Sequence, residues 1–200
     1  MSPDALTTLL RSVEDFRRTE QYNRMNEVAH TLFKALEGNT TSKALRIRAK
    51  AEYERTMAAF QQAEASLAEA LRFAVGSATC AEMAGDPIGM LYADMVRGGH
   101  VLPALRRKDE AIALLKSAHE RAVQLTPDDE AEKLRLSNLL MNILLHLMDL
   151  TIESDGSSGN IQDYVLMLED NSAFQIYLTT KPEWASGYIE KAKAFIRSKA

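Results

Sequence analysis

The segment spanning residues 85–125 constrains the fold most, because it carries two helical patterns on either side of one short charged turn. Gly85 suits the left-handed end of a preceding helix, Asp86 can cap the next helix, and Pro87 occupies a first helical position. Asp109 can accept from free backbone N–H groups and so start the second helix. We therefore expect two antiparallel helices that meet through small side chains.

Small and large residues alternate along this segment at a familiar spacing. Gly99 and Leu102 precede Ala111 by twelve and nine residues, and Leu115 and Ala118 follow it by four and seven. This spacing resembles that of the tetratricopeptide repeat, a family in which small residues let paired helices approach closely. The resemblance implies an all-α chain whose antiparallel helix pairs stack as a right-handed superhelix with a concave surface.

The resemblance also suggests how the chain is organised. Residues 85–200 match the repeat pattern best and are expected to form stacked repeats with a C-terminal capping helix. Residues 1–84 are expected to form a helical hairpin and a long helical region that packs on this array. The whole chain would then be one continuous domain.

Residues 42–84 carry a helical pattern with no Gly or Pro before Gly76. Either one long helix crosses the domain, or a turn near residues 65–68 divides the stretch. The triplets Glu69-Ala70-Leu71 and Glu110-Ala111-Ile112 are similar and lie 41 residues apart. This internal similarity favours the turn.

A strongly apolar helix is expected after Pro127, where the acidic residues 128–130 suit a helix start. Apolar residues surround nearly its whole circumference, so it should pack on several sides and lie at the centre. A polar stripe at three- and four-residue spacing interrupts them and faces either water or a ligand groove. The partner-binding candidates are four members of this stripe and one further histidine: Arg135, Asn138, Asn142, His146 and His100; Asp149 completes the stripe.

The last part of the chain follows a Gly- and Ser-rich segment, Glu153–Asn160, which predicts a loop. Asn160 is expected to cap the next helix. Its apolar stripe consists of Ile161, Tyr164, Val165 and Leu168. In the final helix, Trp184, Tyr188 and Phe195 lie along one face and are expected to close the core.

Composition and charge narrow the classes of partner. A net charge of −4 and an isoelectric point near 5.6 argue against nucleic acid, whose binding needs clustered Lys and Arg. The apolar segment 139–152 is interrupted by polar residues and is too short to cross a bilayer, so no membrane insertion is expected. The single cysteine, Cys80, cannot form an internal disulfide, and residues 1–16 do not resemble a secretion signal. Both features favour the cytoplasm.

No stretch carries a catalytic signature. The four histidines form no pair at ligand spacing, and none lies beside Cys80 or a carboxylate in a ligand pattern. We therefore expect neither a metal nor another cofactor. Ser, Thr and carboxylate side chains occur in no nucleophile-elbow or paired-acid context, so we expect no enzyme.

Two functions stay open. The first is an adaptor that binds a peptide or helix of another protein in a concave groove formed by the repeats. The second is a helical subunit of an obligate oligomer, such as a homodimer, with no separate ligand groove. In the second case an exposed apolar seam over residues 58–81 would form the subunit interface.

Overall fold

The computed structural model describes residues 3–62, 67–154 and 156–199, and these residues form helices and short connections without any strand. The all-α class expected from the sequence is thereby confirmed. The chain divides into two compact units, Met1–Leu105 and Arg106–Ala200. The first unit extends to Leu105, because residues 87–104 pack with the helices that precede them.

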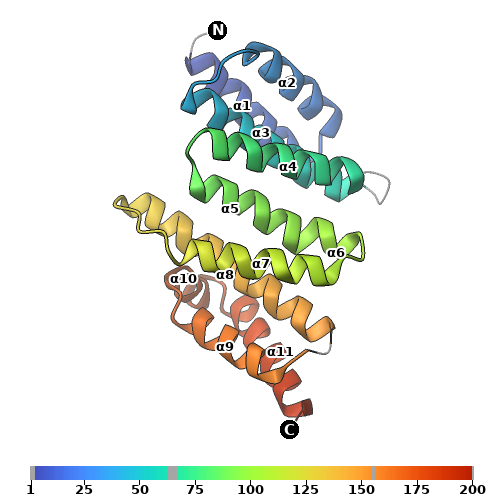
Figure 1. Ribbon diagram of the computed structural model, residues 1–200, viewed down its shortest axis with the longest axis vertical. Helices are drawn as coiled ribbons and strands as arrows, with labels where there is room; N and C mark the ends of the chain where they lie inside the picture. The colour runs from blue at the N-terminus through green and yellow to red at the C-terminus, as the bar shows by residue number, and fades with distance from the viewer. Residues whose placement is uncertain (1–2, 63–66, 155, 200) are drawn as a thin grey trace. The chain divides into compact units, whose positions relative to one another are not determined.

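The first unit is built mainly from five helices that follow one another along the chain (Figure 1). They are α1 (Pro3–Arg18), α2 (Tyr22–Ala35), α3 (Ser42–Gln62), α4 (Leu67–Met83) and α5 (Pro87–Val96), followed by the π-helical turn η2 (Arg97–Val101) and the short α6 (Leu102–Ala104). Helix α1 packs on α2 and α3, and α5 packs on α4 and η2. Each helix therefore buries one side against its neighbours in the chain.

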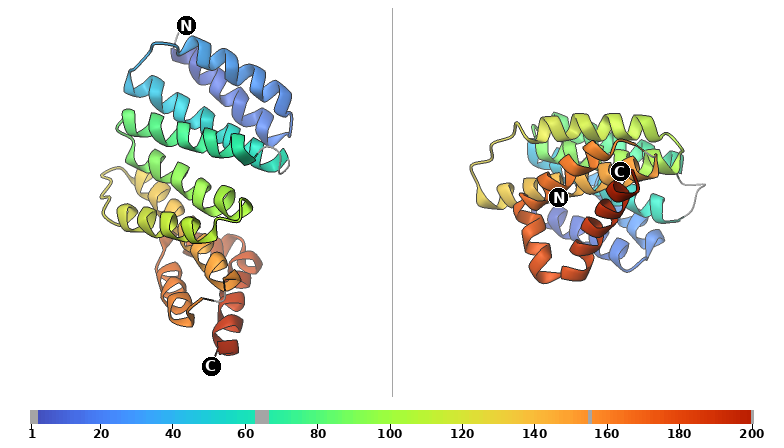
Figure 2. Two further views of the ribbon diagram at one scale, coloured as in Figure 1. Left: turned by 45° about the vertical axis from the view of Figure 1, so that its right-hand side comes forward. Right: turned by 90° about the horizontal axis from the view of Figure 1, so that it is seen from below.

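Helices α3 and α4 lie side by side along most of their length (Figures 1 and 2). They are two helices and not one long rod; the expected turn at residues 65–68 falls largely outside the described residues, and α4 begins at Leu67. Small buried residues bring the two helices close, and the Ser77 hydroxyl donates to the Ala49 carbonyl at 2.7 Å. Close backbone approach of this kind needs small side chains at the contact.

The apolar seam expected to be exposed over residues 58–81 is largely buried inside the first unit. Its buried members are Ala58, Ala59, Leu67, Ala70, Phe73, Ala74 and Ala81. Because these residues fill the space around α3 and α4, they are not free to join two copies of the chain. The prediction of an exposed seam is therefore wrong at these positions.

Helix ends in the first unit follow the local sequence signals. Gly85 adopts a positive φ of 64°, as expected for a left-handed helix end, and its backbone N–H donates to the Glu82 carbonyl. Asp86 caps α5 by accepting from the Gly89 backbone N–H at 2.8 Å, and Pro87 occupies the first turn. These three predictions are confirmed.

The π-helical turn η2 is a feature that the helical pattern does not predict. Pro103 follows it in α6 and has no backbone N–H with which to continue an α-helical ladder to Gly99. A wider turn avoids the clash between the proline ring and that carbonyl, which explains why the helix loosens over Arg97–Val101. Gly99 is half-buried in this turn.

The second unit is arranged around one long helix. Its elements are α7 (Lys108–Ala122), α8 (Glu130–Glu153), α9 (Ser158–Glu169), α10 (Ser172–Thr180) and α11 (Pro182–Lys199). Helix α8 packs against α7, α9, α10 and α11, as its apolar circumference predicts. Asp129 caps α8 by accepting from the Ala131 backbone N–H at 2.8 Å.

Two helix starts differ from the prediction. Helix α7 begins at Lys108 after Arg107, so Asp109 lies inside the first turn and is not the cap. There its carboxylate still lies at the positive end of the helix, which is a favourable place for it. Helix α9 begins at Ser158 after Ser157, two residues before the expected cap, Asn160.

The two helical patterns of residues 85–125 become α5 and α7, which belong to different units. Ala111 and Ala118 are fully buried in α7, which packs on α8 within the second unit. The burial of these small residues is as expected. The close pairing of the two patterns with one another stays a prediction.

Candidate partner-binding cleft

Four of the predicted binding residues lie on α8 of the second unit, whereas His100 lies in η2 of the first unit. The Asn138 side-chain amide donates to the Leu134 carbonyl at 3.0 Å, and that of Asn142 donates to the Asn138 carbonyl at 2.7 Å. Both asparagine side chains therefore donate a hydrogen bond to the backbone of their own helix. His146 is half-buried and Arg135 is exposed.

Asp149 completes the α8 stripe and connects two helices. Its Oδ1 lies 2.6 Å from Nζ of Lys191, which places an ion pair between α8 and α11. Near the other end of α8, Ser137 donates to Asn171 at 3.1 Å and joins α8 to α10. Asp149 of the polar stripe, and Ser137 next to the stripe, thus serve contacts within the unit.

His100 packs against Phe60 with a ring distance of 5.3 Å. Burial lowers the pKa of this imidazole below its ordinary value of 6.5. The neutral form is therefore the one that the folded first unit accommodates. This makes His100 a group whose protonation opposes folding.

Replacing His100 with glutamine is expected to reduce the loss of stability on mild acidification. A histidine whose folded pKa is depressed contributes stability above the unfolded pKa, and this contribution is lost as the pH falls through the folded pKa. Urea unfolding followed by circular dichroism at about pH 7.5 and about pH 5.5 measures the loss for each protein. An equal loss of stability in wild type and His100→Gln would contradict the prediction. Burial also lowers the pKa of His119, but this residue is present in both proteins and does not affect the comparison.

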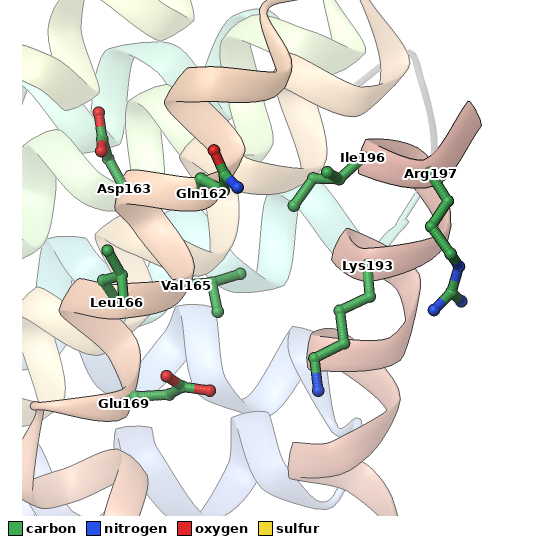
Figure 3. A pocket seen from close by; sticks show the side chains of 8 residues that line it. All are labelled: Gln162, Asp163, Val165, Leu166, Glu169, Lys193, Ile196 and Arg197. Carbon is green, nitrogen blue, oxygen red and sulfur yellow. The ribbon is translucent and has the colours of Figure 1, made fainter. Parts of the chain in front are cut away.

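A cleft of about 620 Å³ opens between α9 and α11 in the second unit (Figure 3). Its apolar residues are Val165, Leu166 and Ile196. Its polar residues are Gln162, Asp163 and Glu169 from α9 and Lys193 and Arg197 from α11. Figure 3 shows Val165 and Ile196 directed toward each other from the two helices. Pockets in the first unit, of about 350 and 60 Å³, are smaller and more polar.

Helix α9 carries more large apolar residues than it buries. The predicted stripe of Ile161, Tyr164, Val165 and Leu168 is buried, which confirms that interpretation. Leu166 and Met167 lie off this stripe and are 60% and 43% exposed. Each leaves apolar surface in water that a partner could cover.

The two walls of the cleft carry opposite charge. Asp163 and Glu169 are exposed on α9, and Lys193 and Arg197 are exposed on α11. Glu169 and Lys193 extend into the space from opposite sides (Figure 3). Lys193 pairs with Glu190 on its own helix at 3.5 Å. Asp163 and Leu166 lie on the side of α9 away from α11, and Arg197 lies on the side of α11 away from α9 (Figure 3). Glu169 and Lys193 are thus the charged side chains directed into the space.

None of the cleft residues is among the predicted binding candidates. A signal was nevertheless present, because Leu166 and Met167 add two large apolar residues beside a stripe that already satisfies the helical period. The basic residues of the cleft gave no such signal, since Lys193 and Arg197 occupy positions where any exposed helix carries charge. Their place opposite α9 depends on the tertiary packing of α11.

The last helix also departs from the expected burial. Trp184 is 40% exposed and contacts Tyr177 and Tyr188 with ring distances of 5.1 Å each. The prediction that Trp184 closes the core is wrong. Smaller residues, including Ala185 and Ala192, are buried there instead, because α11 packs closely on α10 and α9.

Within the described ranges, no three His, Cys, Asp or Glu side chains gather in a way that could hold a metal ion. No helix in this part of the chain combines the length and the apolar character that spanning a bilayer requires. No family model, no curated protein and no solved structure matches this chain.

Proposed function

We propose that this chain is a protein-interaction module that binds a helix or peptide of another protein in the α9/α11 cleft. The observation that carries the proposal is the exposed leucine, Leu166, at the edge of a cleft that Val165 and Ile196 line. Apolar centres with polar rims are the usual composition of protein contacts. The tetratricopeptide-like stacking of helix pairs belongs to the same proposal, as does the absence of enzymatic activity.

The energetics favour a partner with apolar side chains. Burying a leucine side chain completely contributes about 1.5–3 kcal/mol, and more than half of Leu166 is still exposed. Met167 beside it adds an adaptable thioether that fits differently shaped surfaces. A partner that lies over the cleft and over the outer side of α9 would cover Leu166 and the remaining exposed part of Ile196.

Replacing Leu166 with aspartate is expected to weaken partner capture at least tenfold, because it removes apolar contact and places a carboxylate at the interface. Tagged protein would be used to capture partners from a lysate of the source organism, with the amounts measured by mass spectrometry. Leu134→Asp is the matched control, since Leu134 is 46% exposed on α8 and does not line the cleft.

The same capture distinguishes the other surfaces. Equal partner amounts with wild type and Leu166→Asp would refute the cleft as the binding site. If the variant Asn138→Ala plus Asn142→Ala loses the partner instead, binding is assigned to the α8 stripe. If the only chain captured is a second copy, and light scattering shows an assembly that Leu166→Asp dissociates, the chain is an oligomer subunit and the cleft is its interface.

A further inference from the structure

A small polar cavity of about 60 Å³ lies in the first unit, where α2, α3 and α4 meet. Helix α3 lies between α2 and α4 (Figure 1) and contacts both. The cavity is lined by Asn26 from α2, Arg55 and Gln62 from α3, and Glu69 and Phe73 from α4; two alanines of α3 complete it. Four of these seven residues carry polar or charged side chains, so the cavity suits a polar ligand.

Arg55 is the cation of this cavity, and an aromatic ring holds it in place. Its guanidinium carbon lies 3.9 Å from the centre of the Phe73 ring and 5.5 Å from the centre of the Phe33 ring. Because Phe73 also lines the cavity, the guanidinium group lies at the cavity wall. Stacking uses the flat face of a guanidinium and leaves the N–H groups in its plane available as donors.

Arg55 has a donor without an acceptor in the described part of the chain. Its Nε is buried and has no hydrogen-bond partner there. The carboxylate of Glu52 is near, but its Oε2 lies 3.7 Å from Nη1 of Arg55, which is beyond hydrogen-bond range. Burial lowers the pKa of this guanidinium and the charge of Glu52 raises it, but the group stays protonated. Leaving a buried charged donor unpaired is unfavourable, so an anionic acceptor should be attracted here.

We propose that this cavity binds a carboxylate group, which accepts hydrogen bonds from the guanidinium of Arg55 and from the side-chain amides of Asn26 and Gln62. This site lies in the first unit and does not depend on the function proposed for the α9/α11 cleft. A guanidinium and a carboxylate match in shape, because two parallel N–H groups can donate to two oxygens. Since 24% of the Arg55 side chain is exposed, the group is accessible to a ligand.

Size and charge favour a carboxylate over a phosphate group. A space of about 10–15 Å³ already holds one water, so a cavity of about 60 Å³ admits a group of a few heavy atoms. A phosphate group carries more negative charge than a carboxylate, and Glu69 in the wall would repel the additional charge. For a single charge this repulsion is weak, because the Glu69 side chain is 61% exposed and lies 3.7 Å from Arg72.

Nuclear magnetic resonance of the full chain measures binding at the individual donors. Sodium acetate is titrated into protein labelled with ¹⁵N, and sodium chloride at the same ionic strength serves as the reference. Saturable shifts are expected for the Nε–H signal of Arg55 and for the side-chain amide signals of Asn26 and Gln62. The dissociation constant should be millimolar, because so small a ligand makes few contacts.

Variants of the lining residues test the assigned roles. Arg55→Gln should weaken acetate binding at least tenfold, because it removes the cation that lines the cavity. Glu69→Gln should strengthen binding about twofold, since it removes an exposed like charge. Arg46→Gln is the matched control, because Arg46 is exposed on the same helix and does not line the cavity. If circular dichroism shows that Arg55→Gln does not fold, Asn26→Ala replaces an exposed residue and should weaken binding about threefold.

Two peptides identify the source of the carboxylate. One is capped at both ends and carries a single aspartate; the other is acetylated, has no acidic side chain and ends in a free carboxylate. The peptide that shifts the Arg55 signal at the lower concentration shows whether a side chain or a chain end of a partner is the ligand. If acetate shifts this signal and neither peptide does, the ligand is a free small acid.

Three results would overturn the inference. They are shifts that sodium chloride reproduces, acetate binding by folded Arg55→Gln that equals wild type, and inorganic phosphate binding more tightly than acetate. None of them affects the α9/α11 cleft, which the Leu166→Asp variant tests separately.

Discussion

Replacing Phe174 with alanine is expected to destabilise the second unit by about 3–5 kcal/mol. Phe174 is the largest fully buried side chain of α10, which packs against α8, α9 and α11. Truncating a buried phenylalanine loses its transfer free energy and leaves a cavity that the surrounding helices fill only in part. Because domains of this size are stable by about 5–15 kcal/mol, the variant loses a large part of its margin.

Urea unfolding monitored by Trp184 fluorescence measures this effect within the second unit. Trp184 begins α11 and contacts Tyr177 of α10, so its signal follows the helices that Phe174 joins. With a denaturant slope of about 1–3 kcal/mol per molar urea, the midpoint should fall by roughly 2 M. Ile176→Ala is the matched control on the same helix, since Ile176 is 49% exposed, and should change the stability by less than about 0.5 kcal/mol.

If Phe174→Ala cost no more than its control, the packing of α10 on the rest of the unit would be wrong. A smaller cost with an unchanged slope would mean that α8 and α11 close over the cavity. A changed slope would instead indicate that the folded or unfolded state had become more or less compact. The three results are distinguishable in one titration.

Helix ends were predictable from the sequence because the groups that satisfy them are close in the chain. Asp86 lies three residues before Gly89 and accepts a hydrogen bond from its backbone N–H. Asp129 lies two residues before Ala131 and accepts from the backbone N–H of Ala131. A capping side chain and its donor therefore occur in the same short window. Helix α7 shows the limit of such predictions. Its N-cap residue is Arg107, which makes no side-chain cap hydrogen bond, although the capping type Asp109 follows two residues later.

The cleft was not predictable in the same way. Which apolar residues of α9 become buried depends on the positions of α8, α10 and α11, and Leu166 and Val165 are neighbours with opposite outcomes. Periodicity identifies the buried stripe but cannot say whether a second helix covers the residues beside it. The same applies to Trp184. Its size suggested a core residue, but small alanines of α11 are buried there instead.

The α8 stripe shows a different limit. Regular spacing of Asn138 and Asn142 predicts a shared face, and the two residues do follow one another along α8. Their side chains nevertheless donate to carbonyls four residues earlier in the same helix. Spacing alone does not reveal how a polar side chain is used, because asparagine can bond to its own backbone as readily as to a partner.

Removing the positive partner of Glu54 is expected to have the other large effect. Glu54 of α3 forms an ion pair with Arg17 of α1, and only 8% of its side chain is exposed. Replacing Arg17 with methionine would leave a buried carboxylate without its cation, which typically costs about 3–5 kcal/mol. Tyr53 beside it already has a raised pKa, caused first by burial and then by the charge of Glu54.

The outer ion pair between the same helices provides the control. Lys50 and Glu14 also join α3 to α1, at 2.5 Å, but 56% of the Lys50 side chain is exposed. Only the Glu14 carboxylate is left after Lys50→Met, and 16% of its side chain is exposed, against 8% for Glu54, so this change should cost less than Arg17→Met. Urea unfolding of the first unit, followed by circular dichroism, compares the two variants.

The double variant Arg17→Met, Glu54→Leu decides why Arg17→Met destabilises the first unit. The cause is either the lost attraction between the two charges or the buried Glu54 carboxylate left without a cation. If the stranded carboxylate is the cause, replacing it with leucine should recover most of the loss, because apolar substitutes for a buried pair are often nearly neutral. The single change Glu54→Leu should cost less than Arg17→Met, since 21% of the Arg17 side chain is exposed and its guanidinium can turn toward water. A double variant as unstable as Arg17→Met would show that the ion pair itself holds α1 on α3, so that the charge pair is a source of stability and not merely a tolerated burial.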